Sequence, residues 1–442
     1  MPSYYVSTSG NNTNAGTLAA PWATLSYALT TSVVVAGDTI FVRGGTFNDT
    51  VVPTFNGTDT TSTGRINVQN YQNETVWIQP SSNQQGFAID FRNINNHFWS
   101  GIGIDGINGN SSGEPCMTVN GSSNLRYANA TIRDASWSGI LISQSLGDGS
   151  SCVFSSLVIS TGGRIGAGGP AAHGIYFTAS SARTTGFNHQ HVVEDCEITG
   201  YTALSNDAGI QLFSDGVQEP DRLNGITIRR NLIRGNSVGM FIDGSSSTAP
   251  VVIINNVFRQ ITNDVIDLFQ TLTGPVVYHN TIHANGGVGI SVGTNDVVRN
   301  ALIRNNAITN NGSNPVYVRQ ASTSSYALIQ FNGFSANGGG NTVSDSNGLS
   351  TIASNSTSPP SYQDGSTSST DLRLLSTSLY IDAGTTVVAS TVTDDFLRNP
   401  RGSSFDLGAY EFQAQGSPSP LPQNQYPAWQ ITIINIGGAA CR

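Results

Sequence analysis

The sequence predicts an all-β solenoid, a chain wound into stacked coils whose short strands lie parallel to those of the next coil. The first observation is a repeat between Asn224 and Asn337, in which an asparagine flanked by apolar residues recurs at spacings of 25, 24, 26 and 26 residues. Its members are Asn231, Asn256, Asn280, Asn306 and Asn332. The second is that β-branched residues alternate around each asparagine and Gly or Asn closes each run, which indicates strands and tight turns. No unit holds the run of about 10 residues at the 3.6-residue period that a helical repeat requires.

The repeated asparagines are predicted to form a ladder within the scaffold. Strands of neighbouring coils lie about 4.8 Å apart, so each asparagine lies above its copy inside a turn. Its amide can then bond neighbouring backbone and the next amide. Cys196 takes the position of Asn231 in an earlier coil and is predicted to be a buried thiol.

A second strand follows about seven residues after each asparagine and defines a second face. Side chains alternate across a strand, which predicts these inward pairs: Ile175/Phe177, Ile210/Leu212, Met240/Ile242, Ile266/Leu268, Ile290/Val292 and Val316/Val318. The outward side chains, predicted to face water, are Tyr176, Thr178, Gln211, Phe213, Phe241, Asp243, Asp267, Phe269, Ser291, Tyr317 and Arg319. Aromatic rings beside carboxylates on an exposed sheet indicate a sugar-binding groove.

The N-terminal segment is predicted to cover the open end of the stack. Tyr4 to Gly10 forms a strand that ends in a turn, and Ser26 to Val35 is the one segment predicted to be helical. A turn, a strand and another turn follow over Ala36 to Phe47. A short helix over the first coil would protect its edge from water and from edge pairing.

Motifs at both ends of the chain resemble those of right-handed parallel β-helix proteins of the pectate-lyase-like superfamily. They are Tyr5-Val-Ser-x-x-Gly10, Pro21-Trp-Ala-Thr-Leu25, Gly37-Asp-Thr-Ile-x-Val-Arg-Gly-Gly45, Ile381-Asp-Ala-Gly384, Asn399-Pro-Arg-Gly402 and Phe405-Asp-Leu-Gly-Ala-Tyr-Glu-Phe412. The resemblance implies a right-handed parallel β-helix domain over residues 1–412, with a cap and first coil at 1–50 and a closing segment at 372–412. It also implies a secreted or cell-surface, carbohydrate-active protein. It does not imply one activity, because the superfamily includes lyases, hydrolases, epimerases and members with no known reaction.

The chain changes character after residue 412. Residues 413–425 have the composition of a linker, rich in Gln, Ser, Gly and Pro. Within residues 426–442, Trp429 to Ile436 reads as a strand that packs back on the coil or attaches to another molecule. We expect a monomer, with this C-terminal strand as the element that would mediate assembly.

Composition excludes several classes of partner. The 442 residues include 19 basic and 28 acidic side chains, giving a net charge of −9, and every basic residue is arginine. Such a chain has no electrostatic footprint for nucleic acid, and no apolar run approaches the ~18 residues of a membrane span. Residues Met1 to Tyr5 lack the regions of a signal peptide. Nine Asn-x-Ser/Thr sequons permit glycosylation, and Cys116 with Cys152 is the predicted disulfide.

Asp243 and Asp267 are the predicted catalytic pair. They lie in adjacent coils and two strand positions out of register, which separates their Cα atoms by roughly 8 Å. Inverting glycosidases place acid and base about 6.5–9.5 Å apart, leaving room for a water. Asp207 and Asp264 stand at the entrances of their strands and would extend the cluster. Clustered carboxylates raise one another's pKa, which keeps one protonated as the general acid.

Three hypotheses follow from this face. The first, favoured by the carboxylate geometry and the lack of lysine, is a glycoside hydrolase without a cofactor. The second is a polysaccharide lyase with His173, Tyr176 or an arginine as base and Arg183 or Arg319 to neutralise a uronate. Calcium, bound by Asp243, Asp264 and Asp267, is an alternative role for these carboxylates. The third is a non-catalytic glycan-binding or surface-structural protein. The predicted substrate-binding residues are Tyr176, Gln211, Phe241, Tyr317, Arg319 and Arg183.

Overall fold

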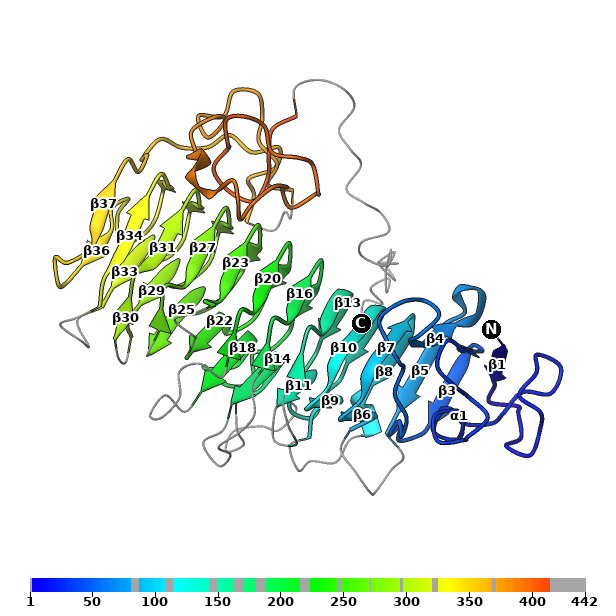
Figure 1. The fold of residues 1–442 in the computed structure, drawn as a ribbon. Helices are drawn as coiled ribbons and strands as arrows, with labels where there is room; N and C mark the ends of the chain where they lie inside the picture. The colour runs from blue at the N-terminus through cyan, green and yellow to red at the C-terminus, as the bar shows by residue number, and fades with distance from the viewer. Residues whose placement is uncertain are drawn as a thin grey trace, which may run out of the picture.

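The computed structural model is a long parallel β-helix (Figure 1). It describes residues 2–80, 87–108, 114–143, 146, 149–162, 171–179, 188–214, 223–244, 249–270, 272–294, 297–319, 325–367 and 371–413. The strands of its two long sheets pair in parallel with those of neighbouring coils along the whole stack. The predicted all-β solenoid is therefore confirmed.

One sheet of ten strands holds the second strand of each repeat. Its members are β6 (Ile89–Arg92), β9 (Met117–Asn120), β11 (Ile140–Ser143), β14 (His173–Ala179), β18 (Ala208–Ser214), β22 (Val238–Asp243), β25 (Ile266–Gln270), β29 (Ile290–Val292), β33 (Val316–Val318) and β36 (Ser344–Asp345). We call it the ten-stranded sheet.

The larger sheet has 25 strands and contributes two strand positions to most coils. The first file contains β1 (Ser3–Val6), β2 (Thr39–Val42), β4 (Ile66–Asn70), β7 (Asn95–Ser100), β16 (Val192–Glu194), β20 (Thr227–Arg229), β23 (Val252–Ile254), β27 (Val276–Tyr278), β31 (Ala301–Arg304), β34 (Ala327–Gln330) and β37 (Thr351–Ala353). The second contains β3 (Gly45–Asn48), β5 (Val76–Gln79), β8 (Ile102–Asp105), β17 (Glu197–Thr199), β21 (Leu232–Arg234), β24 (Val257–Arg259), β28 (Thr281–His283), β32 (Ala307–Thr309) and β35 (Gly333–Ser335). The long strands β10 (Ser123–Arg133) and β13 (Val153–Ser160) run through both files. Short strands β12 (Gly149–Ser150), β15 (Asn188–His189) and β19 (Leu223–Asn224) pair beside the first file, while β26 (Leu272–Thr273) and β30 (Val298–Arg299) pair with each other.

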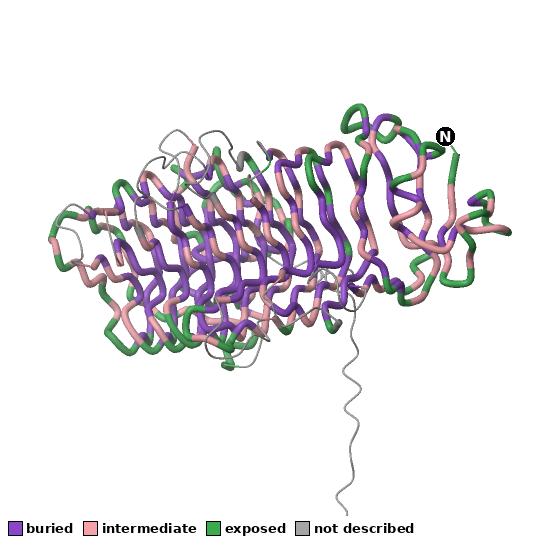
Figure 2. The backbone as a smooth tube through the Cα atoms, turned by 90° about the horizontal axis from the view of Figure 1, so that it is seen from below, coloured by how far each residue is buried: buried purple, intermediate pink, exposed green. Residues whose placement is uncertain are grey.

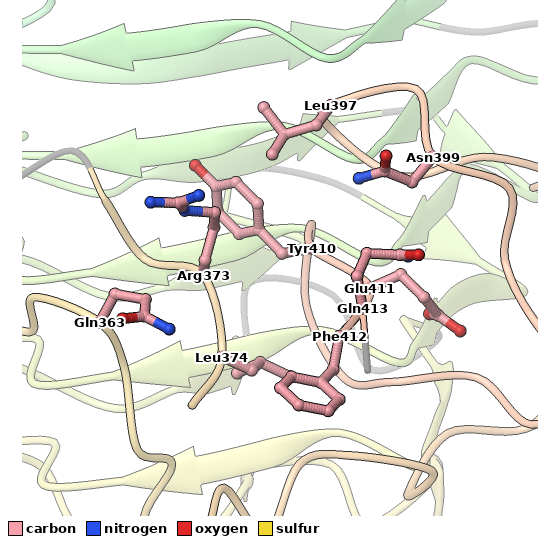
Figure 3. Close-up of a pocket in the computed structure, with 9 residues that line it drawn as sticks. All are labelled: Gln363, Arg373, Leu374, Leu397, Asn399, Tyr410, Glu411, Phe412 and Gln413. Atoms are coloured by element: carbon pink, nitrogen blue, oxygen red, sulfur yellow. The ribbon is translucent and has the colours of Figure 1, made fainter. Parts of the chain in front are cut away.

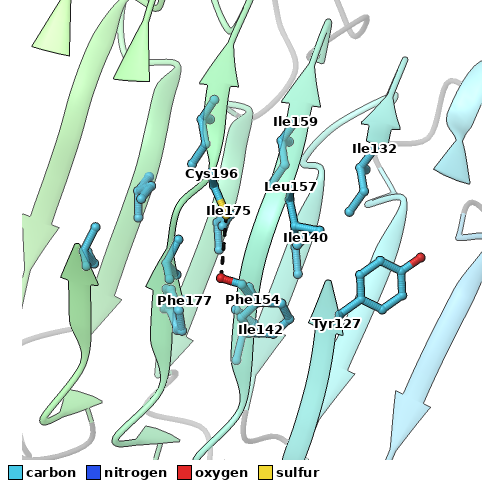
Figure 4. Close-up of a cluster of buried hydrophobic side chains, with 14 of the residues drawn as sticks. Tyr127, Ile132, Ile140, Ile142, Phe154, Leu157, Ile159, Ile175, Phe177 and Cys196 are labelled. Atoms are coloured by element: carbon cyan, nitrogen blue, oxygen red, sulfur yellow. Dashed lines mark hydrogen bonds between the residues drawn. The ribbon is translucent and has the colours of Figure 1, made fainter. Parts of the chain in front are cut away.

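The core runs unbroken through the inside of the coil (Figure 2). All six predicted inward pairs of the ten-stranded sheet, from Ile175/Phe177 to Val316/Val318, are completely buried and belong to this core. Figure 4 shows part of it, where Ile and Phe side chains from facing sheets meet around Cys196. Burial of this continuous apolar interior is the main force that stabilises the stack.

The asparagine ladder is confirmed, and it continues one step further than predicted. In each step the side-chain oxygen of one asparagine accepts the backbone N–H and the side-chain N–H of the asparagine one coil earlier, at 2.9–3.0 Å. Asn355 extends the ladder beyond Asn332. At the other end, the Cys196 amide donates to Asn231 at 3.0 Å and the Cys196 thiol is fully buried, as predicted.

The ladder compensates for an unfavourable backbone in the same turns. The residue before each ladder asparagine is left-handed, with φ between 53° and 57° at Arg230, Asn255, His279, Asn305 and Phe331. Non-glycine residues rarely adopt this conformation, and bulky ones least of all. The buried hydrogen bonds of the adjacent asparagine therefore hold a turn that the local sequence alone would not favour.

A second ladder, which the sequence interpretation missed, lies in the turn that leads from the second strand file to the ten-stranded sheet. Asn285, Asn311 and Asn337 repeat the same bonds at 26-residue spacing, ending on Asn341. Each of these three precedes a glycine, which was the available signal. Asn311 and Asn355 were among the predicted sequons, but both side chains are occupied in ladders, so the folded chain does not present them for glycosylation.

The N-terminal helix is shorter than predicted. Helix α1 covers only Leu25–Ala28, with Thr24 as N-cap, instead of Ser26 to Val35. The run from Thr30 to Val35 is dominated by β-branched residues, which lose side-chain freedom in a helix. Leu25 and Ala28 are nevertheless buried in the main core. Beyond α1, the described helical turns are the 3-10 turns Tyr71–Asn73, Gly106–Asn108 and Thr386–Val388.

The predicted disulfide is wrong. Cys116, Cys152 and Cys196 are free, buried thiols. The Cys152 thiol contacts the carbonyl oxygen of Ser122 and the Cys116 thiol that of Arg133, so each sits against backbone of its own surroundings. Burial raises the pKa of the Cys152 thiol to about 12, which keeps it protonated and unreactive.

The closing segment lies along the side of the coil (Figure 1). Its apolar side chains cover the outward faces of both strand files in three clusters, centred on Phe396 and Tyr410, on Val388 and Phe405, and on Tyr380 and Leu407. Ion pairs add to this contact, since Arg230 is buried and binds Asp195 and Asp394. This cover leaves the outer face of the ten-stranded sheet to other uses.

Candidate functional site

The outer face of the ten-stranded sheet brings Asp243 and Asp267 together as predicted. Strands β22 and β25 pair Phe241 with Asp267, so Asp243 lies one coil away and two positions further along its strand. A register shift follows, because Asp243 pairs with Gln270 and leaves Phe269 as the extra residue. The two carboxylates therefore stand at an irregularity of the sheet, a feature often found beside active sites.

Asp267 is a carboxyl of this face with a strongly raised pKa. It is only 6% exposed, and its Oδ1 accepts a hydrogen bond from the Thr294 hydroxyl at 2.6 Å. Burial raises its pKa to about 6, the charge of Asp264 adds to this rise, and Thr294 and Arg319 oppose it. A carboxyl that carries a proton near pH 6 has the property required of a general acid.

Asp264 and Arg319 form a fixed ion pair beside Asp267. Arg319 Nη2 lies 2.5 Å from Asp264 Oδ2, and the Ser291 hydroxyl donates to the same oxygen at 2.6 Å. The Arg319 guanidinium also lies over the Tyr317 ring, 5.0 Å from its centroid. These residues lie on or directly beside the three successive strands β25, β29 and β33, and together they form one polar cluster.

Tyr176 lies on β14, on the other side of Asp243 and Asp267 from Arg319. Burial raises the pKa of its phenol, and the negative charge of Asp243 raises it further, which places the two groups within electrostatic reach. Its ring packs edge-on against Trp137 at 5.7 Å, and Trp137 Nε1 donates to the Ala171 carbonyl at 2.6 Å. Trp137 was missed from sequence, because it lies in the turn before β11 and outside the strand pattern.

His173 is placed as part of the scaffold. It is 3% exposed, and its Nδ1 accepts the Ala208 amide at 3.2 Å, so the ring is neutral with its proton on Nε2. Burial lowers its pKa to about 3, opposed by a hydrogen bond with the Gln211 side chain. The unprotonated nitrogen of His173 already accepts a hydrogen bond from a backbone amide, so it is poorly placed to take a proton from a substrate.

Asp207 does not join the cluster as an available acid. It is fully buried, and its two oxygens accept the amides of Ala172 at 2.8 Å and Leu204 at 2.9 Å. Both amides belong to turns that lead into the ten-stranded sheet. These contacts assign the Asp207 carboxylate to closing the turn before β18.

The outward face is less exposed than alternation predicts. Asp243, Asp267 and Ser291 are buried, whereas Tyr176, Gln211, Phe241 and Tyr317 are half-buried. Phe241 packs on Phe269 with ring centroids 4.5 Å apart. The face therefore combines buried polar residues with half-buried aromatic ones, and the expectation that all its side chains face water is wrong.

Some predictions lie beyond this geometry. Arg183 and the C-terminal strand within 426–442 fall outside the described residues. Across the described ranges there is no group of three or more His, Cys, Asp or Glu side chains arranged to hold a metal ion, and calcium remains a prediction. The same ranges contain no helix that is both long and apolar enough to span a membrane.

Comparison with known families and structures agrees with the fold. A model described as Pel9A-like, right handed beta helix region, matches residues 4–161, and a model described as right handed beta helix region matches residues 169–332. A search of curated proteins finds no match.

Solved structures share the architecture at low sequence identity. Pectate lyase Pel9A is 16% identical over 93% of this chain and 96% of its own, with a TM-score of 0.55. The complex of XylC with xylose is 11% identical over 94% and 99%, with a TM-score of 0.61. A rhamnogalacturonan lyase is 14% identical over 80% and 88%, with a TM-score of 0.54. At these identities the likeness establishes the fold. With the two family models, it identifies right-handed β-helix regions over residues 4–161 and 169–332 and confirms the parallel β-helix fold that the terminal motifs implied.

Proposed function

We propose that this protein is a secreted or cell-surface glycoside hydrolase that cleaves a polysaccharide with the Asp243 and Asp267 pair. The observation that carries the proposal is a buried carboxyl with a pKa of about 6, Asp267, one coil away from a second carboxyl on the same outward face. Similar folds belong to a pectate lyase, a rhamnogalacturonan lyase and a xylose-binding XylC, which supports a carbohydrate substrate by analogy.

In this mechanism Asp267 is the general acid and Asp243 the general base. Asp267 donates its proton to the leaving glycosidic oxygen, and Asp243 takes a proton from the water that attacks the anomeric carbon from the other side. The register offset corresponds to roughly 8 Å between Cα atoms, which suits inversion at about 6.5–9.5 Å between carboxyls. Phe241 and Tyr317, half-buried on the same face, would stack on sugar rings.

Asp264 and Arg319 would tune Asp267 in opposite directions. The charge of Asp264 raises the Asp267 pKa, and the charge of Arg319, which is paired with Asp264, lowers it. Thr294 would orient the Asp267 carboxyl through the 2.6 Å hydrogen bond to Oδ1. These residues act through Asp267 and are positioning residues.

Elimination by a lyase has weaker support from the candidate bases. His173 uses Nδ1 to bind a backbone amide, and Tyr176 has a raised pKa that disfavours the phenolate. A chain without lysine also cannot supply a lysine base. The lyases among the similar folds keep elimination as the alternative outcome of the experiment, and glycan binding without cleavage is the third.

A polysaccharide panel with two readouts separates the three outcomes. Hydrolysis gives new reducing ends without ultraviolet absorbance, whereas elimination gives unsaturated ends that absorb in the ultraviolet. Retention on one glycan without any product would indicate binding alone. Chelation before the assay tests calcium, since loss of activity that calcium restores would reassign the aspartates as metal ligands.

Two conservative variants test the residue assignment. Asp243→Asn and Asp267→Asn should each lower kcat by about 10²–10⁴ while leaving the melting temperature near that of the wild type. Asp207→Asn is the matched control, because Asp207 binds backbone amides away from the pair; it should affect stability more than kcat. Full activity in both Asp243→Asn and Asp267→Asn would remove the proposed mechanism.

A further inference from the structure

The outer face of the larger sheet is not covered by the closing segment over the first coils. Among the described residues, the apolar clusters and ion pairs of that segment contact coil residues from Asp195 onward. Strands β5 and β8 come before this region, and they pair Trp77 with Gly103. Both residues alternate with buried core residues of their strands, so they belong to the outer face.

A cavity of about 200 Å³ lies on this face, and we call it the Trp77 cavity. Its lining includes Asn70, Glu74, Trp77, Gly103, Asn129 and Thr131. Trp77, Gly103 and Thr131 follow one another at one strand position in three successive coils. The cavity is therefore built by the regular stack and by the turns beside it.

The indole of Trp77 is held in place from two directions. A Cβ atom at Gly103 would lie 2.9 Å from Trp77 Cε3, so the glycine is what lets the ring lie against β8. The Arg133 guanidinium lies 4.1 Å from the ring centroid and forms an ion pair with Asp105 at 2.8 Å. Arg133 is not among the residues that line the cavity, so it supports the ring from outside. A ring fixed in this way loses little freedom when it binds a ligand.

The rim of the Trp77 cavity offers hydrogen bonds without an unpaired charge. Glu74, the charged residue of the lining, is neutralised by Arg43, whose Nε lies 3.0 Å from Glu74 Oε2. Asn70 donates from Nδ2 to the Glu74 carbonyl at 2.9 Å, and Asn129 donates from Nδ2 to the Ser100 hydroxyl at 3.0 Å. Both side-chain oxygens therefore remain to accept hydrogen bonds from a ligand. An aromatic wall with a few uncharged polar groups suits a neutral sugar better than an anion.

A cavity in the closing segment lacks this combination. It measures about 90 Å³, less than half the volume of the Trp77 cavity, and lies between Leu374, Leu397 and Tyr410 (Figure 3). Tyr410 is 3% exposed and packs on Phe396 with ring centroids 5.2 Å apart, so its ring is not available to a sugar.

We propose that the Trp77 cavity binds one neutral sugar unit of a polysaccharide, with the sugar ring against Trp77 and its hydroxyls donating to Asn70 and Asn129. The inference rests on the proposed function only for the choice of a polysaccharide as ligand. Six successive strand pairings separate β5 from β24, the strand before Asp267. At about 4.8 Å per coil this is roughly 29 Å along the stack. The cavity is therefore a second, non-catalytic site that anchors a long chain.

Affinity gel electrophoresis tests the site with xylan, galactan, mannan and a soluble β-glucan, and with polygalacturonate and alginate as anionic comparators. The parent chain is Asp267→Asn, so that cleavage does not disturb the measurement. It is produced in a host without N-glycosylation, because Asn129 begins a sequon. At least one neutral polysaccharide should retard the parent chain, and adding Trp77→Ala should raise the Kd about tenfold.

Phe98→Ala is the matched control for Trp77→Ala. Phe98 is a half-buried aromatic residue on the outer face of the same sheet, but it does not line the Trp77 cavity, so this variant should bind like the parent chain. Thr131→Phe leaves Trp77 in place and fills the cavity. It should weaken binding as Trp77→Ala does, which excludes lost packing of the indole as the cause.

Cleavage assays separate this site from the catalytic one. In the otherwise wild-type chain, Trp77→Ala should raise KM for the polysaccharide and leave kcat/KM for a short oligosaccharide unchanged, because a short chain does not span the two sites. Equal binding by Trp77→Ala and its parent chain, or retardation by none or only by the anionic polysaccharides, would overturn the Trp77 site. Binding that depends on Trp77 without any cleavage would support this site and overturn the hydrolase proposal alone.

Discussion

The asparagine ladder should contribute more stability per residue than any exposed polar contact, and Asn280→Ala measures this. Asn280 is completely buried and takes part in five side-chain hydrogen bonds. It donates to Ile253, Tyr278 and Asn306, and its oxygen accepts the backbone and side-chain N–H groups of Asn256. At about 1 kcal/mol for each bond, with extra cost for orphaned buried groups and some relaxation, we expect a loss of about 3–5 kcal/mol.

Urea unfolding followed by circular dichroism gives the free energy of unfolding for this comparison. Asn263→Ala is the control, because Asn263 is exposed and donates one hydrogen bond, to Ser205 at 2.7 Å; it should lose about 1 kcal/mol or less. If Asn280→Ala lowered the free energy of unfolding no more than Asn263→Ala, the ladder would not be a major stabilising element of the coil. A change in the urea slope would instead indicate that part of the coil unfolds separately.

Three further outcomes are expected. If Asp267 is the general acid, kcat/KM should fall about tenfold for each pH unit above its pKa of about 6, since only the protonated form donates; a flat profile from pH 5 to 8 would contradict this. The native chain should react slowly with Ellman's reagent, and denaturation should expose three more reactive thiols, those of Cys116, Cys152 and Cys196. Exposure of only one would indicate that Cys116 and Cys152 form a disulfide after all. Burial lowers the folded-state pKa of four histidines, so the unfolded chain binds protons first and stability should fall as pH drops from 6.5 towards 4, by about 1.4 kcal/mol per pH unit for each histidine. They are His97, with a pKa of about 4, His173, about 3, His283, about 4, and His279, whose pKa lies well below its ordinary value. His97→Gln should lower that slope, and stability that is unchanged between pH 7 and 5 would refute the argument.

The most useful signals for predicting the fold were the two-residue period of the strands and the repeat length of the coil. A strand has a two-residue period and a coil a nearly constant length, so the inward residues, the ladder and the offset between Asp243 and Asp267 could all be read from sequence. The same reasoning missed Trp137 and Thr294, because each lies in a turn where no period applies. It also overestimated helix α1, whose limit is set by a β-branched run.

Chemistry at the candidate site depended on neighbours that periodicity does not identify. His173 and Asp207 looked equivalent to other strand-entrance residues, yet each binds a backbone amide of another coil or turn. Asp264 looked like a further acid and is instead an ion-pair partner of Arg319 from two coils away. Which partner a side chain meets depends on loop paths, and loops of unequal length shift those paths without disturbing the repeat.

The sequence by itself determined the stacked coil, its inward and outward faces and the register that places Asp243 near Asp267, because these follow from local alternation and a fixed repeat. Tertiary structure alone decided the surroundings of Asp267. Its raised pKa depends on burial and on charges that come from residues of other coils. Electrostatic energy varies with the surroundings in three dimensions, and no local pattern records those surroundings.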